Sequence, residues 1–322
     1  MGKSLNMKYY LRDNKIIFTL DAVRFMSQPP LLFDFDLIKG LDYRIIISHG
    51  IMGELLNFLE KDFYGLDKSK LIFLTNNLEI NNILNKKGCR CFNISEYIFL
   101  NDDYYKILDL KKEYDCVYMG RRAKIENLFK IPFKSTIKPY ILHEDSGIEE
   151  SLASQYYNKA RCGISPSKTE GSCRSVAEML MCGLPVVNIK MPSLPSDQYY
   201  PNSKTLLYSA YSEILPNTLG GRELWLDNSN SIICELEDKA IDNAIQSIIS
   251  KELPSNNIRE NFLSKLSQER FKFLLLLKTI TEELNLNFWD IPINEVINLP
   301  YSNCSTNTQE WSKTLNYFKT LY

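Results

Sequence analysis

The sequence predicts an α/β protein built from two parallel-sheet domains. Short apolar runs of strand type alternate along the chain with longer segments that are apolar at helical spacing. This alternation is typical of parallel sheets covered by helices. A polar stretch at 101–115 interrupts it, after which a second series of strand-type runs begins. A chain of 322 residues has room for two domains of ordinary size. We therefore expect a cleft where the carboxyl ends of the strands bind ligands.

The first series of elements lies in a short N-terminal domain, predicted at 1–112. A segment at helical spacing, 53–63, separates the second strand from the third, and another, 78–88, separates the third from the fourth. The second segment ends in Gly88, a residue that commonly stops a helix. The expected strands of this domain are 15–20, 44–50, 71–77 and 89–95.

The second series is predicted to form a C-terminal domain at 113–275. The polar stretch 101–115 precedes it as a linker, and 190–219, rich in Pro, Ser and Tyr, is expected to be a long loop or insertion. A long amphipathic helix is predicted at 258–284, and 276–322 is expected to form a helical segment that returns to the N-terminal domain. The expected strands of the second series are 116–120, 136–142, 161–167, 184–189 and 231–236.

The composition excludes several classes of function. A net charge of -1 provides no basic field for a nucleic-acid backbone. No apolar run reaches the roughly 18 residues of a membrane span. Several cysteines lie inside apolar runs as free thiols, which predicts a cytoplasmic protein, with peripheral contact at the inner face of the membrane as the minority interpretation. The eight cysteines form no CxxC pair and only two histidines are present, so we expect no metal site.

The stretch "EGSCRSVAEMLMCGLPVV" at 170–187 has two interpretations. Glu170, Arg174 and Glu178 are spaced i, i+4 and i+8, which on a solvated helix would be a salt-bridge ladder. The flanking sequence favours a ligand site instead. A buried-strand pattern precedes the stretch, a helix is expected to begin near Ser172 or Cys173, and "CGLP" ends it.

Such a strand–loop–helix unit has the chemistry of a nucleotide-sugar site. The N–H groups of the first helical turn attract phosphate, and Gly171 allows the backbone to approach a ligand closely. Glu170 in the loop can accept hydrogen bonds from sugar hydroxyls. Glu178, about two turns along, can accept both hydroxyls of a ribose, because a carboxylate only accepts and a diol offers two donors.

These residues resemble the donor site of retaining GT-B glycosyltransferases of the large family with an E-x7-E motif, of the bacterial, family 4-like type. "YDCVYMGRR", "GGRELWLDNSNSIICEL" and "CFNISEYIFLND" resemble further segments of that family in the same order, over roughly residues 70–275. The resemblance implies a GT-B fold, with two Rossmann-like domains facing a cleft. It implies that Glu170 contacts the donor sugar and Glu178 the ribose, and that Gly171, Ser172 and Cys173 face the sugar and phosphate.

The resemblance also implies a phosphate contact after the strand at 116–120. Arg121 matches the arginine of the family's Gly-Arg pair, which contacts the pyrophosphate. The family usually has a lysine five residues later, where this chain has Glu126. Lys124 is the expected substitute, with Arg122 as another candidate. Loss of one such charge-stabilising donor typically raises a barrier by about 2.7–4 kcal/mol.

His49 follows a predicted strand and precedes two glycines, so it is either structural or the catalytic histidine that family members often carry near the donor sugar. For His143 the structural role is the expected one. Arg222 could bind an anion or pair with Glu223, and the sequence does not decide between these roles.

The expected function is transfer of a hexose-type sugar from a nucleotide-sugar donor to a glycan, lipid-linked or small-molecule acceptor, as in polysaccharide biosynthesis. The resemblance implies retention, no metal and no cofactor besides the donor substrate. A non-catalytic GT-B partner subunit and a nucleotide-sugar epimerase remain the alternatives. The sequence leaves the donor, the acceptor and the oligomeric state open.

Overall fold

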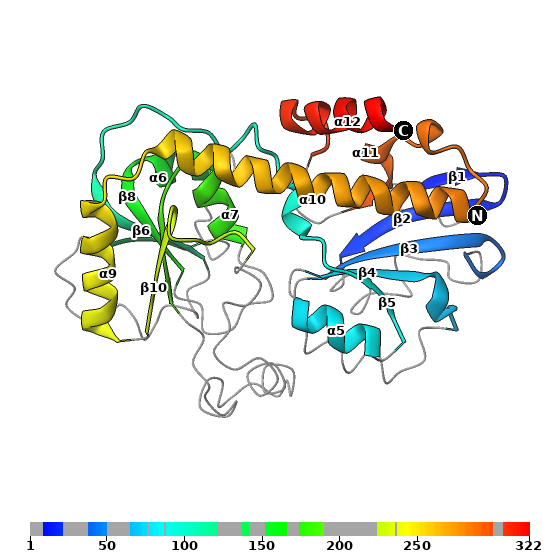
Figure 1. Ribbon diagram of the computed structural model, residues 1–322, viewed down its shortest axis with the longest axis horizontal. Helices are drawn as coiled ribbons and strands as arrows, with labels where there is room; N and C mark the ends of the chain where they lie inside the picture. The colour runs from blue at the N-terminus through cyan, green and yellow to red at the C-terminus, as the bar shows by residue number, and fades with distance from the viewer. Residues whose placement is uncertain are drawn as a thin grey trace. The chain divides into compact units, whose positions relative to one another are not determined.

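The computed structural model describes residues 9–21, 38–49, 65–75, 78–86, 88–120, 137–141, 152–165, 174–189, 224–235, 237–298 and 305–322 (Figure 1). The predicted helix at 53–63 and the predicted loop at 190–219 lie outside these residues. The described chain forms two compact units. Unit 1 contains the described residues up to Leu100 and from Ser267 onward, and unit 2 contains those between them.

Unit 1 is built on a mixed six-stranded sheet, ordered β1-β2-β3-β4-β5 with β11 also paired to β2. Strands β2 to β5 are parallel, β1 is antiparallel to β2, and β11 is parallel to β2. All five residues of β4 are buried, as expected for a continuous apolar run covered on both faces. The strands are β1 (Tyr10–Arg12), β2 (Lys15–Asp21), β3 (Asp42–His49), β4 (Leu71–Thr75), β5 (Arg90–Phe92) and β11 (Ile297–Asn298).

The described helices of unit 1 lie between its strands in the chain and in its C-terminal part. Gly88, with φ +81°, follows α5 and confirms the predicted glycine stop. The C-terminal helix α12 buries Trp311 and Phe318, which contact Phe273 and Phe271 of α10 through ring centroids 6.5 and 5.2 Å apart. The elements are η1 (Lys68–Lys70), α5 (Leu78–Lys86), η2 (Glu96–Phe99), η6 (Phe288–Asp290), α11 (Ile293–Val296) and α12 (Gln309–Leu321).

Unit 2 contains a five-stranded parallel sheet, ordered β10-β9-β8-β6-β7. Each strand lies where an apolar run predicts one; β6 begins two residues earlier than predicted, and the other four strands are shorter than their predicted runs. The strands are β6 (Tyr114–Gly120), β7 (Ile137–Ile141), β8 (Ala160–Ser165), β9 (Val186–Ile189) and β10 (Ser231–Cys234). A mainly parallel, mixed sheet in unit 1 and a parallel sheet in unit 2 confirm the predicted α/β class.

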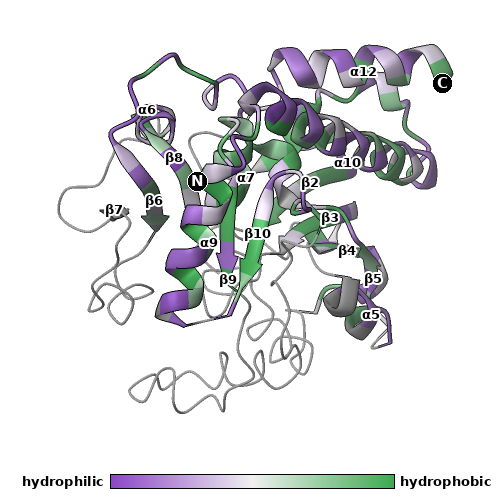
Figure 2. Ribbon diagram, turned by 60° about the vertical axis from the view of Figure 1, so that its left-hand side comes forward, coloured by the Kyte–Doolittle hydropathy of each residue, from purple (hydrophilic) through white to green (hydrophobic). Residues whose placement is uncertain are grey.

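Among the described residues, the helices that belong entirely to unit 2 are α6 (Ala153–Asn158), α7 (Arg174–Met181) and α9 (Asp238–Ser250). Helices α6 and α9 were not predicted from the sequence. Ile241, Ile245 and Ile248 of α9 pack into one core cluster with buried residues of β6, β8 and β9. Hydrophilic and hydrophobic residues alternate along α9 and α12, as in amphipathic helices (Figure 2).

The long helix predicted at 258–284 is confirmed as α10 (Ser255–Glu283), and it contributes to both units. The units change at Leu100 and again at Leu266, whereas the sequence places boundaries after residues 112 and 275. The first of these differences arises because the predicted linker belongs to unit 2. Lys106 N–H donates to Ser154 Oγ, and Leu108 N–H donates to Asn158 Oδ1, so this stretch packs along α6 of unit 2. Within the described ranges, no helix is both long and apolar enough to cross a bilayer.

Helix α7 ends in a Schellman motif, which explains the "CGLP" sequence. Gly183 N–H donates to Leu180 C=O and Leu184 N–H donates to Met179 C=O, so two terminal carbonyls are satisfied. Gly183 has φ +67°, a conformation that side chains rarely adopt. A Cβ at this position would also lie 2.5 Å from the backbone oxygen of Ser255, at the start of α10.

We expect Gly183→Ala to lower the free energy of unfolding by about 2 kcal/mol, because it adds left-handed strain and a clash with backbone. Gly88→Ala is the matched control: its φ is +81°, but nothing lies within 4 Å of an added Cβ. The control should therefore lose only the strain component, about 1 kcal/mol. Urea unfolding of both variants measures the difference. Equal losses would show that contact with α10 contributes nothing.

Candidate donor site in unit 2

The carboxyl ends of the unit 2 strands are where a ligand is expected. Strand β6 ends at Gly120 and β8 ends at Ser165. Residues 166–173 connect β8 to α7, and residues 121–136 connect β6 to β7. Most predicted donor residues fall in these connections, outside the described residues: Arg121, Lys124, Glu170, Gly171, Ser172 and Cys173. Their roles stay predictions, although their places in the chain put them directly after strands.

His49 is the last residue of β3 in unit 1, and it pairs in register with Thr75 of β4. It therefore belongs to the carboxyl end of the unit 1 sheet, as the sequence predicts. Its side chain lies outside what the structure describes, and its catalytic role remains a prediction.

Glu178 is the predicted donor residue that the structure describes in full. It lies within α7, and its side chain is only 6% exposed. Its carboxylate accepts from two buried phenols: Tyr105 donates to Oε1 at 2.9 Å and Tyr157 donates to Oε2 at 2.7 Å. Arg174 Nε lies 2.9 Å from Oε1 and completes an ion pair. The site thus places a paired and hydrogen-bonded carboxylate on the helix that follows β8.

This burial excludes a solvated ladder as the explanation of Glu178. The pair with Arg174 has the predicted i, i+4 spacing, but the arginine side chain is itself only 21% exposed. A surface ladder would leave both groups in water. A charge taken out of water needs partners of the kind that Glu178 has.

Tyr157 stays protonated in this environment. Burial, followed by the nearby Glu178 carboxylate and Tyr105, raises the pKa of Tyr157 well above its ordinary value. Its hydroxyl is therefore a permanent donor to Glu178 across the physiological range. Cys182, one turn further, is not a nucleophile, because burial raises the pKa of its thiol to about 12.

Arg259 connects the partners of Glu178. From the first part of α10, its Nη1 donates to the carbonyls of Tyr105 and Met181, and its Nη2 donates to the carbonyl of Asp102 at 3.3 Å. Met181 is the last residue of α7, so the guanidinium neutralises the negative end of the helix that carries Glu178. It fixes the segment around Tyr105 at the same time.

Tyr105, Tyr157 and Arg259 were not predicted from the sequence as site residues. The available signal was weak: each residue sits in an ordinary polar or amphipathic stretch far from 170–187. Gly163 of β8 also helps to position α7, and a glycine inside a strand is a stronger sequence signal of close packing. A Cβ there would overlap Met179 Sδ, so α7 lies close against β8 and its position is fixed by packing.

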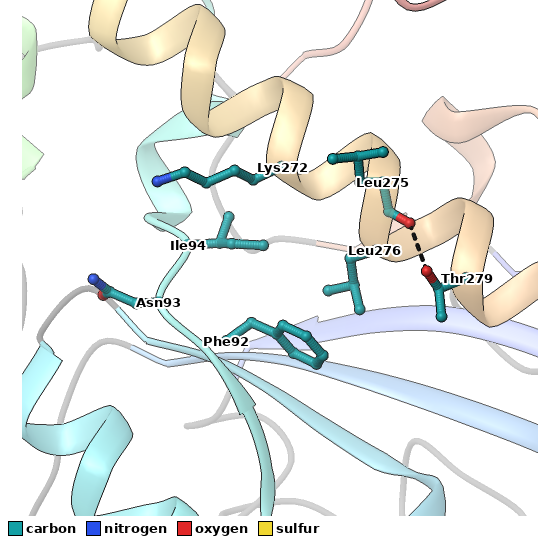
Figure 3. Close-up of a pocket in the computed structure, with 7 residues that line it drawn as sticks. All are labelled: Phe92, Asn93, Ile94, Lys272, Leu275, Leu276 and Thr279. Carbon is teal, nitrogen blue, oxygen red and sulfur yellow. Dashed lines mark hydrogen bonds between the residues drawn. The ribbon is translucent and has the colours of Figure 1, made fainter. Parts of the chain in front are cut away.

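Unit 1 contains a separate pocket of about 310 Å³ (Figure 3). Phe92, Asn93 and Ile94 line it from the end of β5, and residues of α10 line it opposite. Its lining is mostly apolar, and Lys272, beside it, forms a 2.5 Å ion pair with the buried Glu269. The α10 residues that line it are Lys272, Leu275, Leu276 and Thr279.

The sequence of the chain matches no protein-family model, and the search of curated proteins finds no relative. Solved structures are similar. Sucrose-phosphate synthase from Thermosynechococcus elongatus matches with a TM-score of 0.53 at 13% identity, over 77% of this chain and 71% of that one. A glycosyltransferase from Rickettsia africae ESF-5 matches with a TM-score of 0.50 at 12% identity, over 82% and 77%. At these identities the likeness concerns the fold alone, and the fold of this chain is GT-B.

Proposed function

We propose that this protein is a glycosyltransferase that moves a sugar from a nucleotide-sugar donor to an acceptor. The observation that carries the proposal is Glu178. A GT-B fold holds this carboxylate on the helix that follows a parallel strand, at the position that resembles the family's second motif glutamate. Two solved structures of the same fold are named as a sucrose-phosphate synthase and a glycosyltransferase, which supports the same reaction class here.

In the proposed reaction, the bond between the anomeric carbon and the diphosphate oxygen breaks. A bond between that carbon and an acceptor hydroxyl oxygen forms, and the hydroxyl proton passes to the departing diphosphate oxygen. The diphosphate leaves with its charge stabilised by Arg121, Lys124 and the N–H groups at the start of α7. Glu170 acts on the donor sugar and Glu178 holds the ribose, and the family resemblance gives His49 a catalytic role.

Finer features of the proposal come from the family resemblance. The sugar is a hexose, transferred with retention, and the acceptor is a glycan or a lipid-linked or small molecule in the cytoplasm. Glu126, in place of the family's usual lysine, favours one alternative: a GT-B subunit that binds but does not catalyse. An epimerase of this architecture is the other alternative.

The products of one incubation distinguish these functions. The protein is incubated with UDP-, GDP- and ADP-sugars and mixed acceptors, and the nucleotides and glycosides are separated by chromatography. A transferase releases nucleoside diphosphate together with a glycoside. An epimerase changes only the sugar of the donor, and a binding subunit changes nothing, although donors still raise its melting temperature.

Activity is expected to persist in EDTA, because Arg121 and the helix start take the place of a cation. The sequence does contain a pair of aspartates two apart, Asp34 and Asp36, outside the described residues. The expectation therefore rests on the resemblance and not on a shortage of carboxylates. Turnover is measured with EDTA and after addition of manganese. Loss in EDTA and recovery with manganese would contradict metal independence and the family assignment.

We expect Glu178→Ala to weaken nucleoside-diphosphate binding by about 2 kcal/mol, within the worth of hydrogen bonds to a charged group. Calorimetric titration measures this affinity. Glu113→Ala is the control, since Glu113 is 41% exposed and pairs with Lys159 at the surface of the same unit. If the Glu178→Ala protein is folded and binds the nucleoside diphosphate as tightly as wild type, Glu178 does not bind the donor.

A further inference from the structure

We propose that Tyr157 and Tyr105 are positioning residues, which hold the Glu178 carboxylate in the orientation that reads the two hydroxyls of a ribose. The inference rests on the proposed function, in which Glu178 binds the ribose of the donor. It goes further because it assigns specificity for ribose to two tyrosines that do not touch the nucleotide themselves.

The geometry of the carboxylate carries the inference. Tyr105 donates to one oxygen at 2.9 Å and Tyr157 donates to the other at 2.7 Å. With a tyrosine hydroxyl on each oxygen and Arg174 paired with Oε1, the carboxylate cannot rotate about its terminal torsion without losing a contact. That torsion is otherwise broad and loosely defined for glutamate. The two tyrosines, together with Arg174, therefore fix the plane of the carboxylate.

Both donors are themselves held in place. Tyr157 is fully buried on α6, and Tyr105 is fully buried in the stretch that follows unit 1. Asn158 Nδ2 donates to Lys106 C=O at 2.8 Å, next to Tyr105, and Arg259 holds the Tyr105 carbonyl. The two phenols thus come from separate elements that are tied together, and neither can follow the carboxylate if it turns.

A positioning role and a packing role predict different results. If the tyrosines only stabilise unit 2, removing a hydroxyl weakens every nucleotide equally. If the tyrosines orient Glu178 toward a diol, removing a tyrosine hydroxyl weakens binding of the ribonucleotide more than binding of the 2′-deoxyribonucleotide. The deoxy form lacks one of the two hydroxyl donors of the ribose. The ratio of the two affinities is therefore the quantity to measure.

The experiment titrates the full chain with UDP, ADP and GDP and with their 2′-deoxy forms. For the base that binds, we expect wild-type protein to prefer the ribonucleotide by about tenfold, the worth of a hydrogen bond to a charged group. Tyr157→Phe is expected to reduce this preference by about threefold or more, and Glu178→Gln to remove most of it. Tyr104→Phe, next to Tyr105 but 44% exposed, should keep the wild-type ratio.

The outcomes separate the two proposals. If Glu178→Gln loses the preference while Tyr157→Phe keeps it, or weakens both nucleotides equally, the positioning role is wrong and the proposed function stands. If wild-type protein binds none of the nucleotides, the proposed function fails and this inference with it. Circular dichroism checks folding, and Tyr105→Phe gives the same comparison if Tyr157→Phe does not fold.

Discussion

Replacing Arg270 by methionine is expected to lower the free energy of unfolding by about 3–4 kcal/mol. The side chain is 1% exposed, and it donates to the carbonyls of Ile98 at 3.0 Å and Leu100 at 3.3 Å. Its guanidinium also lies 5.0 Å from the ring of Trp311. Each charged hydrogen bond contributes about 1.5–3 kcal/mol, and a desolvated cation–π contact adds to it. Methionine fills the space but leaves both carbonyls without this donor.

The measurement is chemical denaturation, with Arg12→Met as the control. Arg12 forms a 2.6 Å pair with Asp290, but the two side chains are 53% and 42% exposed. An exposed pair contributes less than about 1 kcal/mol. Comparable losses in the two variants would mean that the buried network around η2 stabilises unit 1 no more than a surface pair does.

Glu170→Gln is expected to reduce turnover by roughly a hundredfold or more, while nucleotide affinity stays close to wild type. Glu170 lies in the connection from β8 to α7, eight residues before the buried Glu178. In the proposed function the nucleotide is held by Glu178, Arg121 and the start of α7. Glu170 acts on the sugar, where charge develops in the transition state.

Steady-state turnover and calorimetric affinity are measured for Glu170→Gln beside wild type. The control is Glu113→Gln, a surface carboxylate of unit 2 that should leave both quantities unchanged. Near-normal turnover of Glu170→Gln would favour the other interpretation, in which Glu170 only forms a charge pair with Arg174. A parallel fall in affinity and turnover would instead place Glu170 at the nucleotide.

The strands were predictable because their signal is local. Runs such as "RIIISH" and "LIFLT" are continuous and rich in branched residues, and buried parallel strands need little else. The end of α7 was predictable for the same reason, since Gly183 and Pro185 act on their own neighbours. Helices α6 and α9 were not predicted, because helical spacing is a weaker local signal in a short segment than a continuous apolar run.

The surroundings of Glu178 could not be predicted from spacing. Tyr105 and Tyr157 are 73 and 21 positions away in the chain, and only the fold brings them to one carboxylate. The charged spacing of Arg174 and Glu178 is the same on a solvated face and in a buried site. The change of unit within α10 was hidden for a related reason: an unbroken helix gives no local sign that its packing partner changes.

The division of α10 between the units sets an order for synthesis. Unit 2 has all of its described residues once Leu266 has been made, whereas unit 1 still lacks β11, α12 and most of α10. Translation at roughly 5–20 residues per second leaves several seconds between the two events. Through that interval β2 is translated but lacks β11, a partner about 280 positions later. A ribosome stalled once Leu266 has emerged from the exit tunnel should therefore carry a protease-resistant unit 2, while the part of unit 1 before Leu100 stays sensitive.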